Sequence, residues 1–332
     1  MEKNFIGTDV NQVKITSLSR IRGIPQVIDN LNVNLQAYFN SRSTSGSSYS
    51  SFGPTILCGP PGIGKTLVAE AIHAELGNDK LIETTGETIN NKIELFSILI
   101  NATDYTTIFV DEVQGANSKA QRILLPALSE KKLHLPNSIS SARSYTIPLA
   151  NFTFIMATTH EYMISDPLRN RMRIYCRFDY YSIEDLTEIV RQRAEALNWK
   201  YESDEVLKII AQASKRTPRL ALERNLRMCW CVAQSQDRDV ITLSDVHEAF
   251  RLLQIDYLGL DQLERSYLKT LSEHGRLSLG VLSSKLGQQA LTIQMVVEPY
   301  LLKEDFITKT TASVRVITEK GIKHLEDSPL SF

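Results

Sequence analysis

The chain has 332 residues, enough for one large domain or for two to three smaller ones, each with an apolar core. Its 37 lysines and arginines face 38 aspartates and glutamates, so a net charge of −1 gives no general attraction to nucleic acid. The 42% apolar and 23% charged residues exclude a disordered or fibrous protein, and no apolar run reaches the roughly 20 residues that span a bilayer.

The N-terminus and the cysteines favour a reducing compartment. The first ten residues contain Glu2 and Asp9 and no apolar stretch, unlike a signal peptide, so we expect a cytoplasmic protein. We expect the cysteines to be small buried side chains, because their spacing matches neither a zinc site nor a disulfide framework. They are Cys58, Cys176, Cys229 and Cys231.

The first part of the chain shows an alternating pattern. Residues 41–51 are almost wholly Ser, Thr, Gly and Tyr, which predicts a flexible linker or surface loop. Beyond it, continuous apolar runs alternate with helical patterns, which is typical of an α/β fold with a parallel sheet covered on both faces. The expected strands are 55–58, 81–85, 107–110, 152–157 and 174–178.

The second part of the chain is organised differently. Helical periodicity alone predicts a small helical domain over 182–255, with a last helix that starts at the N-cap Thr242 and ends near Gln254. Three further helices and a β-hairpin predict a winged helix over 256–332, which leaves 1–181 as the first domain. The helices are 262–273, 280–286 and 293–302, and the hairpin strands are 306–308 and 314–318.

The sequence Gly59-Pro-Pro-Gly-Ile-Gly-Lys-Thr66 is the strongest functional signal, because it fits G-x-x-x-x-G-K-[ST] between a predicted strand and a helix. Backbone N–H groups of such a loop surround phosphate oxygens, and the helix N-terminus adds partial positive charge. Lys65 is expected to reach the β- and γ-phosphates and Thr66 to bind Mg²⁺. The expected nucleotide contacts are Gly59, Pro60, Pro61, Gly62, Ile63, Gly64, Lys65, Thr66 and Leu67.

Two later strands end in polar residues that suit phosphoryl transfer. Asp111 and Glu112 follow the third predicted strand, where Asp111 can hold Mg²⁺ through water and Glu112 can deprotonate the attacking water. A strand that ends in Asp-Glu is common, but its position after a P-loop predicts a Walker B segment. Thr158 and Thr159 end the next strand and are expected near the γ-phosphate or the attacking water.

Arginines occur at two further places. Arg169 and Arg171 precede the fifth strand, and an arginine that projects from the subunit surface can complete a neighbour's site. The alternative is an ordinary surface salt bridge. Arg219, in Arg216-Thr-Pro-Arg219 at a helix start, is a candidate to sense loss of the γ-phosphate.

These motifs, in this order, resemble the AAA+ ATPases, and six segments resemble the RuvB family, the bacterial motors of Holliday-junction branch migration. The segments are 59–66, 157–159, 165–171, 216–219, 256–261 and 298–301, and the resemblance covers about residues 18–325. It implies an AAA+ P-loop domain, a helical lid domain and a winged helix, assembled as a ring hexamer. It also implies roles for Arg171 as an arginine finger, Tyr181 as a nucleotide contact and Arg219 as the second sensor.

The sequence departs from the family pattern in four places. The family's Asp-Glu-Ile-His-Arg is Asp111-Glu-Val-Gln-Gly115 here, and its N-terminal Leu-Arg-Pro is Val13-Lys14-Ile15. Residues 133–149, which match the partner-binding hairpin, are rich in Ser and include one Asn. The arginine-rich wing has become Lys309-Thr-Thr-Ala-Ser-Val-Arg315, so only Lys309 and Arg315 remain as candidate DNA contacts.

The leading hypothesis is an ATP- and Mg²⁺-dependent DNA motor for recombination and repair. Glu112, Lys65 and Arg171 would catalyse its ATP hydrolysis, and a RuvA-like partner would bind at residues 133–149. Residues 256–332 contain nine basic and ten acidic side chains, so binding to DNA should be weak per subunit. An alternative is an AAA+ switch that remodels a protein, with the winged helix as docking module. A DNA-binding regulator without turnover is disfavoured because all the catalytic residue types are present.

Overall fold

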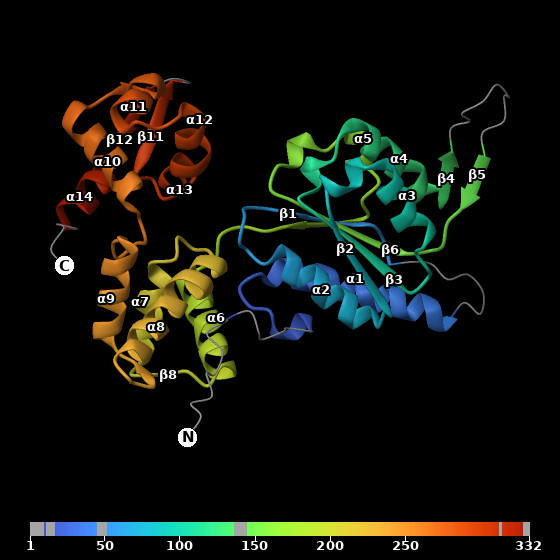
Figure 1. Ribbon diagram of the computed structural model, residues 1–332, viewed down its shortest axis with the longest axis horizontal. Coiled ribbons are helices and arrows are strands. Elements are labelled where there is room, and N and C mark those ends of the chain that lie inside the picture. The colour runs from blue at the N-terminus through green and yellow to red at the C-terminus, as the bar shows by residue number, and fades with distance from the viewer. Residues whose placement is uncertain (1–9, 11–16, 45–51, 136–144, 312–313, 328–332) are drawn as a thin grey trace. The chain divides into compact units, whose positions relative to one another are not determined.

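The computed structural model describes Val10 and residues 17–44, 52–135, 145–311 and 314–327. It divides into two compact units (Figure 1). One is Lys14–Tyr181, and the other combines Met1–Val13 with Ser182–Phe332.

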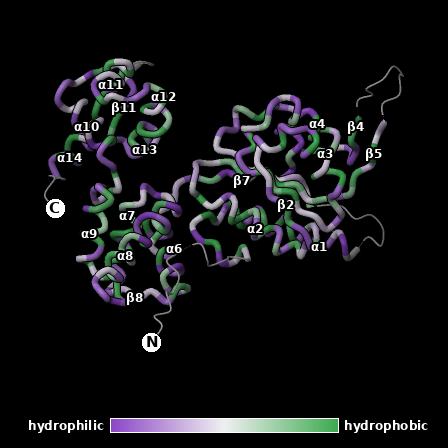
Figure 2. Tube along the Cα trace, in the orientation of Figure 1, coloured by the Kyte–Doolittle hydropathy of each residue, from purple (hydrophilic) through white to green (hydrophobic). Residues whose placement is uncertain are grey.

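A five-stranded sheet in the order β2-β3-β6-β1-β7 forms the centre of the first unit, and every neighbouring pair is parallel. The expected parallel α/β fold is therefore confirmed. Hydrophobic residues gather along these strands (Figure 2), because helices cover both faces of the sheet. The strands are β1 (Thr55–Cys58), β2 (Lys80–Thr85), β3 (Thr106–Asp111), β6 (Thr153–Thr158) and β7 (Ile174–Arg177).

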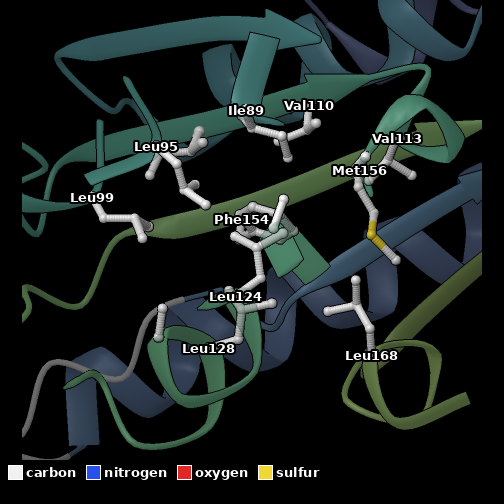
Figure 3. Packing of buried hydrophobic residues seen from close by; sticks show 14 of the residues in the cluster. Ile89, Leu95, Leu99, Val110, Val113, Leu124, Leu128, Phe154, Met156 and Leu168 are labelled. Carbon is white, nitrogen blue, oxygen red and sulfur yellow. The ribbon is translucent and has the colours of Figure 1, made fainter. Parts of the chain in front are cut away.

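Helices α1 (Pro25–Thr44) and α2 (Lys65–Leu76) lie on one face of the sheet, and α3 (Lys92–Ile100), α4 (Ser118–Ser129) and α5 (Asp166–Arg169) lie on the other (Figure 1). The packing on the second face fixes the ends of β3 and β6 (Figure 3). Burial of each such Leu or Phe stabilises the fold by about 1.5 to 3 kcal/mol. The residues shown there include Leu95, Leu99, Val110, Leu124, Leu128, Phe154 and Met156.

The start of the Ser-rich segment is helical, which corrects the expectation of a loop over 41–51. Helix α1 continues to Thr44. The Ser41 hydroxyl donates to the Tyr38 carbonyl at 2.7 Å, and Arg42 donates to the Tyr38 hydroxyl at 3.1 Å. These contacts within the last turns outweigh the low helix propensity of serine and threonine. Residues 45–51 lie outside the described residues.

The N-terminal part of the second unit is helical, as expected. It contains α6 (Ile183–Ala196), α7 (Asp204–Gln212), a π-helical turn (Leu220–Leu226), α8 (Arg227–Ser235) and α9 (Leu243–Leu253). Two short strands, β8 (Lys200–Tyr201) and β9 (Val240–Ile241), pair in parallel. Thr242 begins α9 through a capping box with Asp245, which confirms the predicted N-cap.

The C-terminal part of the second unit confirms the winged helix. Helices α10 (Gln262–His274), α11 (Leu279–Leu286), α12 (Ala290–Thr292) and α13 (Glu298–Lys303) precede the hairpin, with a π-helical turn (Ile293–Val297) between the last two. Strands β11 (Ile307–Thr311) and β12 (Val314–Ile317) form the hairpin. The sequence did not reveal strand β10 (Leu277–Ser278), which pairs with β12, or helix α14 (Glu319–Asp327).

Polar contacts tie the lid helices to the winged helix. The half-buried Lys215 ammonium lies 2.5 Å from the buried Glu264 of α10, and Arg216 pairs with Glu304 at 2.9 Å. The connecting segment passes so close that a Cβ on Gly259, whose φ is +81°, would lie 2.1 Å from the Ala213 carbonyl oxygen. Glycine is therefore required at this position of the linker.

Cys58, Cys176 and Cys229 are buried thiols, Cys231 is half-buried, and none forms a disulfide. Within the described ranges, no group of three or more His, Cys, Asp and Glu side chains has the arrangement of a metal site. No helix in those ranges is long and apolar enough to span a membrane.

Candidate nucleotide-binding site

The P-loop connects β1 to α2 as the sequence predicts. Gly64 is the N-cap of α2 with a φ of +94°, a left-handed conformation that favours glycine. A Cβ on Gly59 would lie 2.7 Å from the Phe178 carbonyl oxygen, so the loop can pack against the end of β7 only without a side chain there. The close fit produces a cradle at the start of a 12-residue helix, where phosphate groups are stabilised.

Lys65 and Thr66 occupy the first turn of α2. Lys65 is buried, and its ammonium donates to the carbonyl oxygens of Gly59 at 2.9 Å and Pro60 at 2.8 Å. Its charge therefore lies inside the loop rather than in solvent. The Thr66 hydroxyl donates to Asp111 Oδ2 at 3.2 Å, which brings the P-loop and the Walker B segment together. Hydroxyl and carboxylate oxygens are ligands that Mg²⁺ prefers, so this pair fits the ion.

Glu112 adopts a left-handed backbone conformation, with φ of 46° and ψ of 47°, which costs about 1 kcal/mol or more for a residue with a Cβ. Neighbouring backbone groups stabilise this turn. The Glu112 N–H donates to Asp111 Oδ1 at 2.8 Å, and the Gly115 N–H donates to the Glu112 carbonyl at 2.9 Å. Gly86 approaches so closely that a Cβ would lie 2.4 Å from that same carbonyl oxygen. The Glu112 side chain that this turn carries is exposed.

Thr158 ends β6 and Thr159 follows it, and Thr159 lies beside Glu112. The Thr159 hydroxyl is 3.1 Å from Glu112 Oε2. Gln114 connects the same residues: its Nε2 donates to Glu112 Oε2 and, at 3.0 Å, to the Thr159 hydroxyl, while its Oε1 accepts from Thr158 at 2.6 Å. Sequence reasoning gave Gln114 no role, although its place in an altered Walker B segment was a signal that could have identified it.

Tyr181 and the two arginines before β7 take different positions. Tyr181 is buried, and its hydroxyl donates to the Ile63 carbonyl of the P-loop at 2.9 Å. Arg169 forms ion pairs with Asp166 at 2.5 Å and with Glu161 at 3.7 Å. Arg171 is exposed and has no acidic partner among the described residues. The structure thus separates the two arginines, because among the described residues only Arg169 has acidic partners.

Arg219 belongs to the second unit, so it is not among the residues that the first unit brings together. It lies in the helical residues directly before the π-helical segment Leu220–Leu226, and its side chain is exposed. Its Nε lies 3.9 Å from Glu223, one helical turn further along the chain.

The structure corrects the expectation that Arg315 contacts DNA. Arg315 is only 2% exposed, and it donates from Nε to Glu298 Oε1 at 2.8 Å and from Nη2 to Oε2 at 3.2 Å. Lys309 lies 2.8 Å from the same carboxylate but stays partly accessible. Burial favours the neutral form of Glu298, but the donors from Arg315 and Lys309 outweigh it and lower the pKa of this carboxyl. Arg315 therefore stabilises the interior of the winged helix.

Family models match three consecutive parts of the chain. The RuvB P-loop domain of Holliday junction DNA helicases matches residues 13–178, the RuvB AAA lid domain residues 181–256, and the RuvB C-terminal winged helix domain residues 257–326. These matches cover the P-loop, the lid helices and the wing described above.

Several RuvB proteins are similar to this chain in sequence or structure over nearly its whole length. The Holliday junction branch migration complex subunit RuvB of Kosmotoga olearia is 31% identical over 98% of this chain and 95% of its own. The Thermotoga maritima RuvB Holliday junction branch migration motor has a TM-score of 0.78 and 29% identity, over 94% of this chain and 98% of its own. A mutant of the same protein has a TM-score of 0.80 and 28% identity, over 96% and 100%. The chain therefore belongs to the RuvB family of AAA+ P-loop ATPases.

Proposed function

We propose that the chain is an ATP-driven motor that moves branched DNA, with subunits assembled in a ring. One observation carries this proposal: Lys65, Thr66, Asp111 and Glu112 meet at one edge of the sheet, in a chain that also holds a lid and a winged helix. The domain limits 1–181, 182–255 and 256–332 are part of the proposal. A cytoplasmic location is also part of the proposal. The three buried free cysteines support it, because thiols stay reduced in that compartment.

Nucleotide binding is a property of the P-loop family, and the residues present fit an Mg²⁺·ATP complex. Lys65 lies in the cradle to bind the β- and γ-phosphates, and Thr66 and Asp111 supply oxygen atoms for the ion. Bound Mg²⁺ neutralises charge on the phosphate oxygens. Glu112 accepts the proton of the attacking water, while Thr158 and Thr159 lie where they can orient it. Tyr181 supports the loop through Ile63.

We propose that the site is completed by a neighbouring subunit. Arg171 is exposed and has no acidic partner within the described part of its own chain, so its guanidinium can enter the next subunit's site and stabilise charge on the transferred phosphoryl group. A hexameric ring provides such a neighbour at every interface. Arg219, from the lid, is proposed to sense the γ-phosphate.

DNA contact is proposed to be weak for each subunit and additive around the ring. Of the two wing cations, Lys309 remains partly accessible, while Arg315 is buried. Because affinity for DNA comes largely from phosphate neutralisation, binding requires several winged helices acting together. A RuvA-like partner at residues 133–149 would load the ring on a junction. Of these residues, 136–144 lie outside the described part of the chain, and the flanking strands β4 (Lys132–Leu135) and β5 (Tyr145–Pro148) pair with each other.

ATP hydrolysis measured without DNA, with linear duplex and with a four-way junction tests this proposal. We expect turnover to rise with DNA and to rise most with the junction. Hydrolysis that is identical in all three conditions would contradict a DNA motor, while absence of hydrolysis would contradict the proposed site.

A second candidate, an AAA+ switch that remodels a protein partner, is favoured by one specific observation. Both cations of the wing pair with the buried Glu298, so the hairpin presents little free charge to DNA. In this case the winged helix serves as a docking module, and hydrolysis responds to a protein rather than to DNA.

A further inference from the structure

We propose that Gln114 is a positioning residue for ATP hydrolysis, which holds the Glu112 carboxylate so that one of its oxygen atoms faces the attacking water. The inference rests on the proposed role of Glu112 as the group that accepts the proton of that water. It adds a second residue, from the altered part of the Walker B segment, to the machinery of the site.

Both ends of the Gln114 amide are used. Its Nε2 donates to Glu112 Oε2 and to the Thr159 hydroxyl, and its Oε1 accepts from the Thr158 hydroxyl. The reversed amide would direct a carbonyl oxygen at the carboxylate and an N–H at the Thr158 hydroxyl. The amide orientation shown is therefore the one that links Glu112 to the end of β6.

The two carboxylate oxygens of Glu112 differ as a result. Oε2 receives the Gln114 and Thr159 contacts, whereas Oε1 has no hydrogen-bond donor in the part of the chain that the structure describes. A general base must have an atom within hydrogen-bond reach of the proton that it accepts, and Oε1 is available for this. If Gln114 is removed, the exposed Glu112 side chain keeps only the 3.1 Å contact with Thr159 and gains rotational freedom.

A purely structural role for Gln114 is less consistent with its contacts. The backbone of this turn is fixed without that side chain, because Gly86 N–H donates to Asp111 O at 2.9 Å and Gly115 N–H to Glu112 O at 2.9 Å. Gln114 is half-buried, and the side-chain contacts described above all involve Glu112, Thr158 and Thr159. These are the residues assigned to the attacking water.

The first test is Gln114→Met, which keeps the length of the side chain and removes the amide. Loss of a hydrogen bond to a charged group should lower kcat for ATP by about 10- to 100-fold. Binding of a fluorescent ATP analogue should stay within about 2-fold of wild type, because the P-loop does not contact this amide. A kcat within about 2-fold of wild type would overturn the proposal.

The second test is Gln114→Glu, which is isosteric but places a second carboxylate against Glu112. The two like charges repel and displace Glu112 from its contacts with residue 114 and Thr159. We therefore expect kcat to fall at least as far as in Gln114→Met, while binding of the ATP analogue stays within about 2-fold of wild type.

Gln262→Glu, at the exposed start of α10, is the matched control because it adds the same charge far along the chain from Glu112. Its kcat should match that of wild type. A Gln114→Glu variant whose kcat also matches wild type would overturn the inference. The variant Glu112→Gln distinguishes failure of the proposed catalytic site from failure of the Gln114 inference alone. If that variant hydrolyses ATP normally, the proposed site is wrong, whereas loss of turnover there with normal Gln114 variants rejects only this inference.

Discussion

Arg315 of β12 donates a 2.8 Å hydrogen bond to Glu298, at the start of α13, and both side chains are buried. Tyr267 of α10 donates to the same carboxylate at 3.1 Å. One carboxylate thus joins the wing to two helices of the domain. The geometry explains why an arginine in a hairpin that resembles a DNA-binding wing has its charge directed inward.

We predict that Arg315→Met destabilises the winged helix by about 3 to 5 kcal/mol, because it removes the buried partner of Glu298. Lys309→Met is the matched control, since it removes a partly exposed cation from the same carboxylate and should cost about 1 kcal/mol or less. Hydrogen exchange of winged-helix amides in the full-length chain measures both. Equal protection of these amides from exchange in the two variants would show that the burial of Arg315 adds nothing to the stability of the winged helix.

The contribution of the Glu298 carboxylate to the free energy of unfolding should depend on pH. The folded state holds the pKa of Glu298 below its ordinary value of 4.5. The corresponding stabilisation is therefore present above the pKa of the unfolded chain and is lost as the pH falls through the lower, folded value. Glu298→Gln keeps an acceptor oxygen but does not titrate, so we expect lower stability at neutral pH and a flatter decline in acid. Urea unfolding from about pH 7 to about pH 3 tests this; parallel curves for wild type and variant would contradict it.

Local sequence signals predicted much of the fold correctly. The strand Thr55–Cys58 and the N-cap Thr242 lie where expected, because continuous apolar runs and capping residues determine structure within a few neighbours. The P-loop could be assigned for the same reason. Its glycines and Lys65 act through the local turn and the first residues of α2.

Features that depend on distant partners could not be predicted. The sequence shows Arg315 as a charged residue in a hairpin, and only packing against Glu298 makes it an interior residue. The difference between Arg169 and Arg171 likewise depends on Glu161, which the chain brings beside Arg169. The altered Walker B segment draws attention to Gln114, but its contacts with Thr158 and Thr159 follow only from the pairing of β3 with β6.

The P-loop and Walker B residues should separate nucleotide binding from turnover. Lys65→Ala removes the ammonium held in the loop and should abolish ATP binding. Glu112→Gln keeps the phosphate contacts and removes the base, so ATP should bind normally and remain unhydrolysed, with kcat lower by about 10²-fold or more. Equilibrium binding and single-turnover hydrolysis measure the two steps. Loss of binding in both variants would contradict the role of Glu112.

Lys309 is the remaining wing cation that can approach a phosphate. Lys309→Gln should lower the slope of log affinity against log salt for a four-way junction by about one, while Lys200→Gln in the lid should leave it unchanged. A slope that matches wild type would show that the wing does not bind DNA and would favour the protein-remodelling candidate.

Arg171 supplies the decisive test of a shared site. Arg171→Ala should bind ATP normally yet lose about 10³-fold or more in turnover, because the missing guanidinium belongs to the neighbour's reaction. Arg173→Ala is the matched control, since Arg173 is also exposed but its side chain packs beside Gly53 of its own subunit, and it should keep turnover. Mixing Arg171→Ala with Lys65→Ala should restore part of the activity, because some interfaces then pair an intact P-loop with an intact Arg171. Turnover that never returns on mixing would mean that Arg171 acts within its own subunit or that no ring forms.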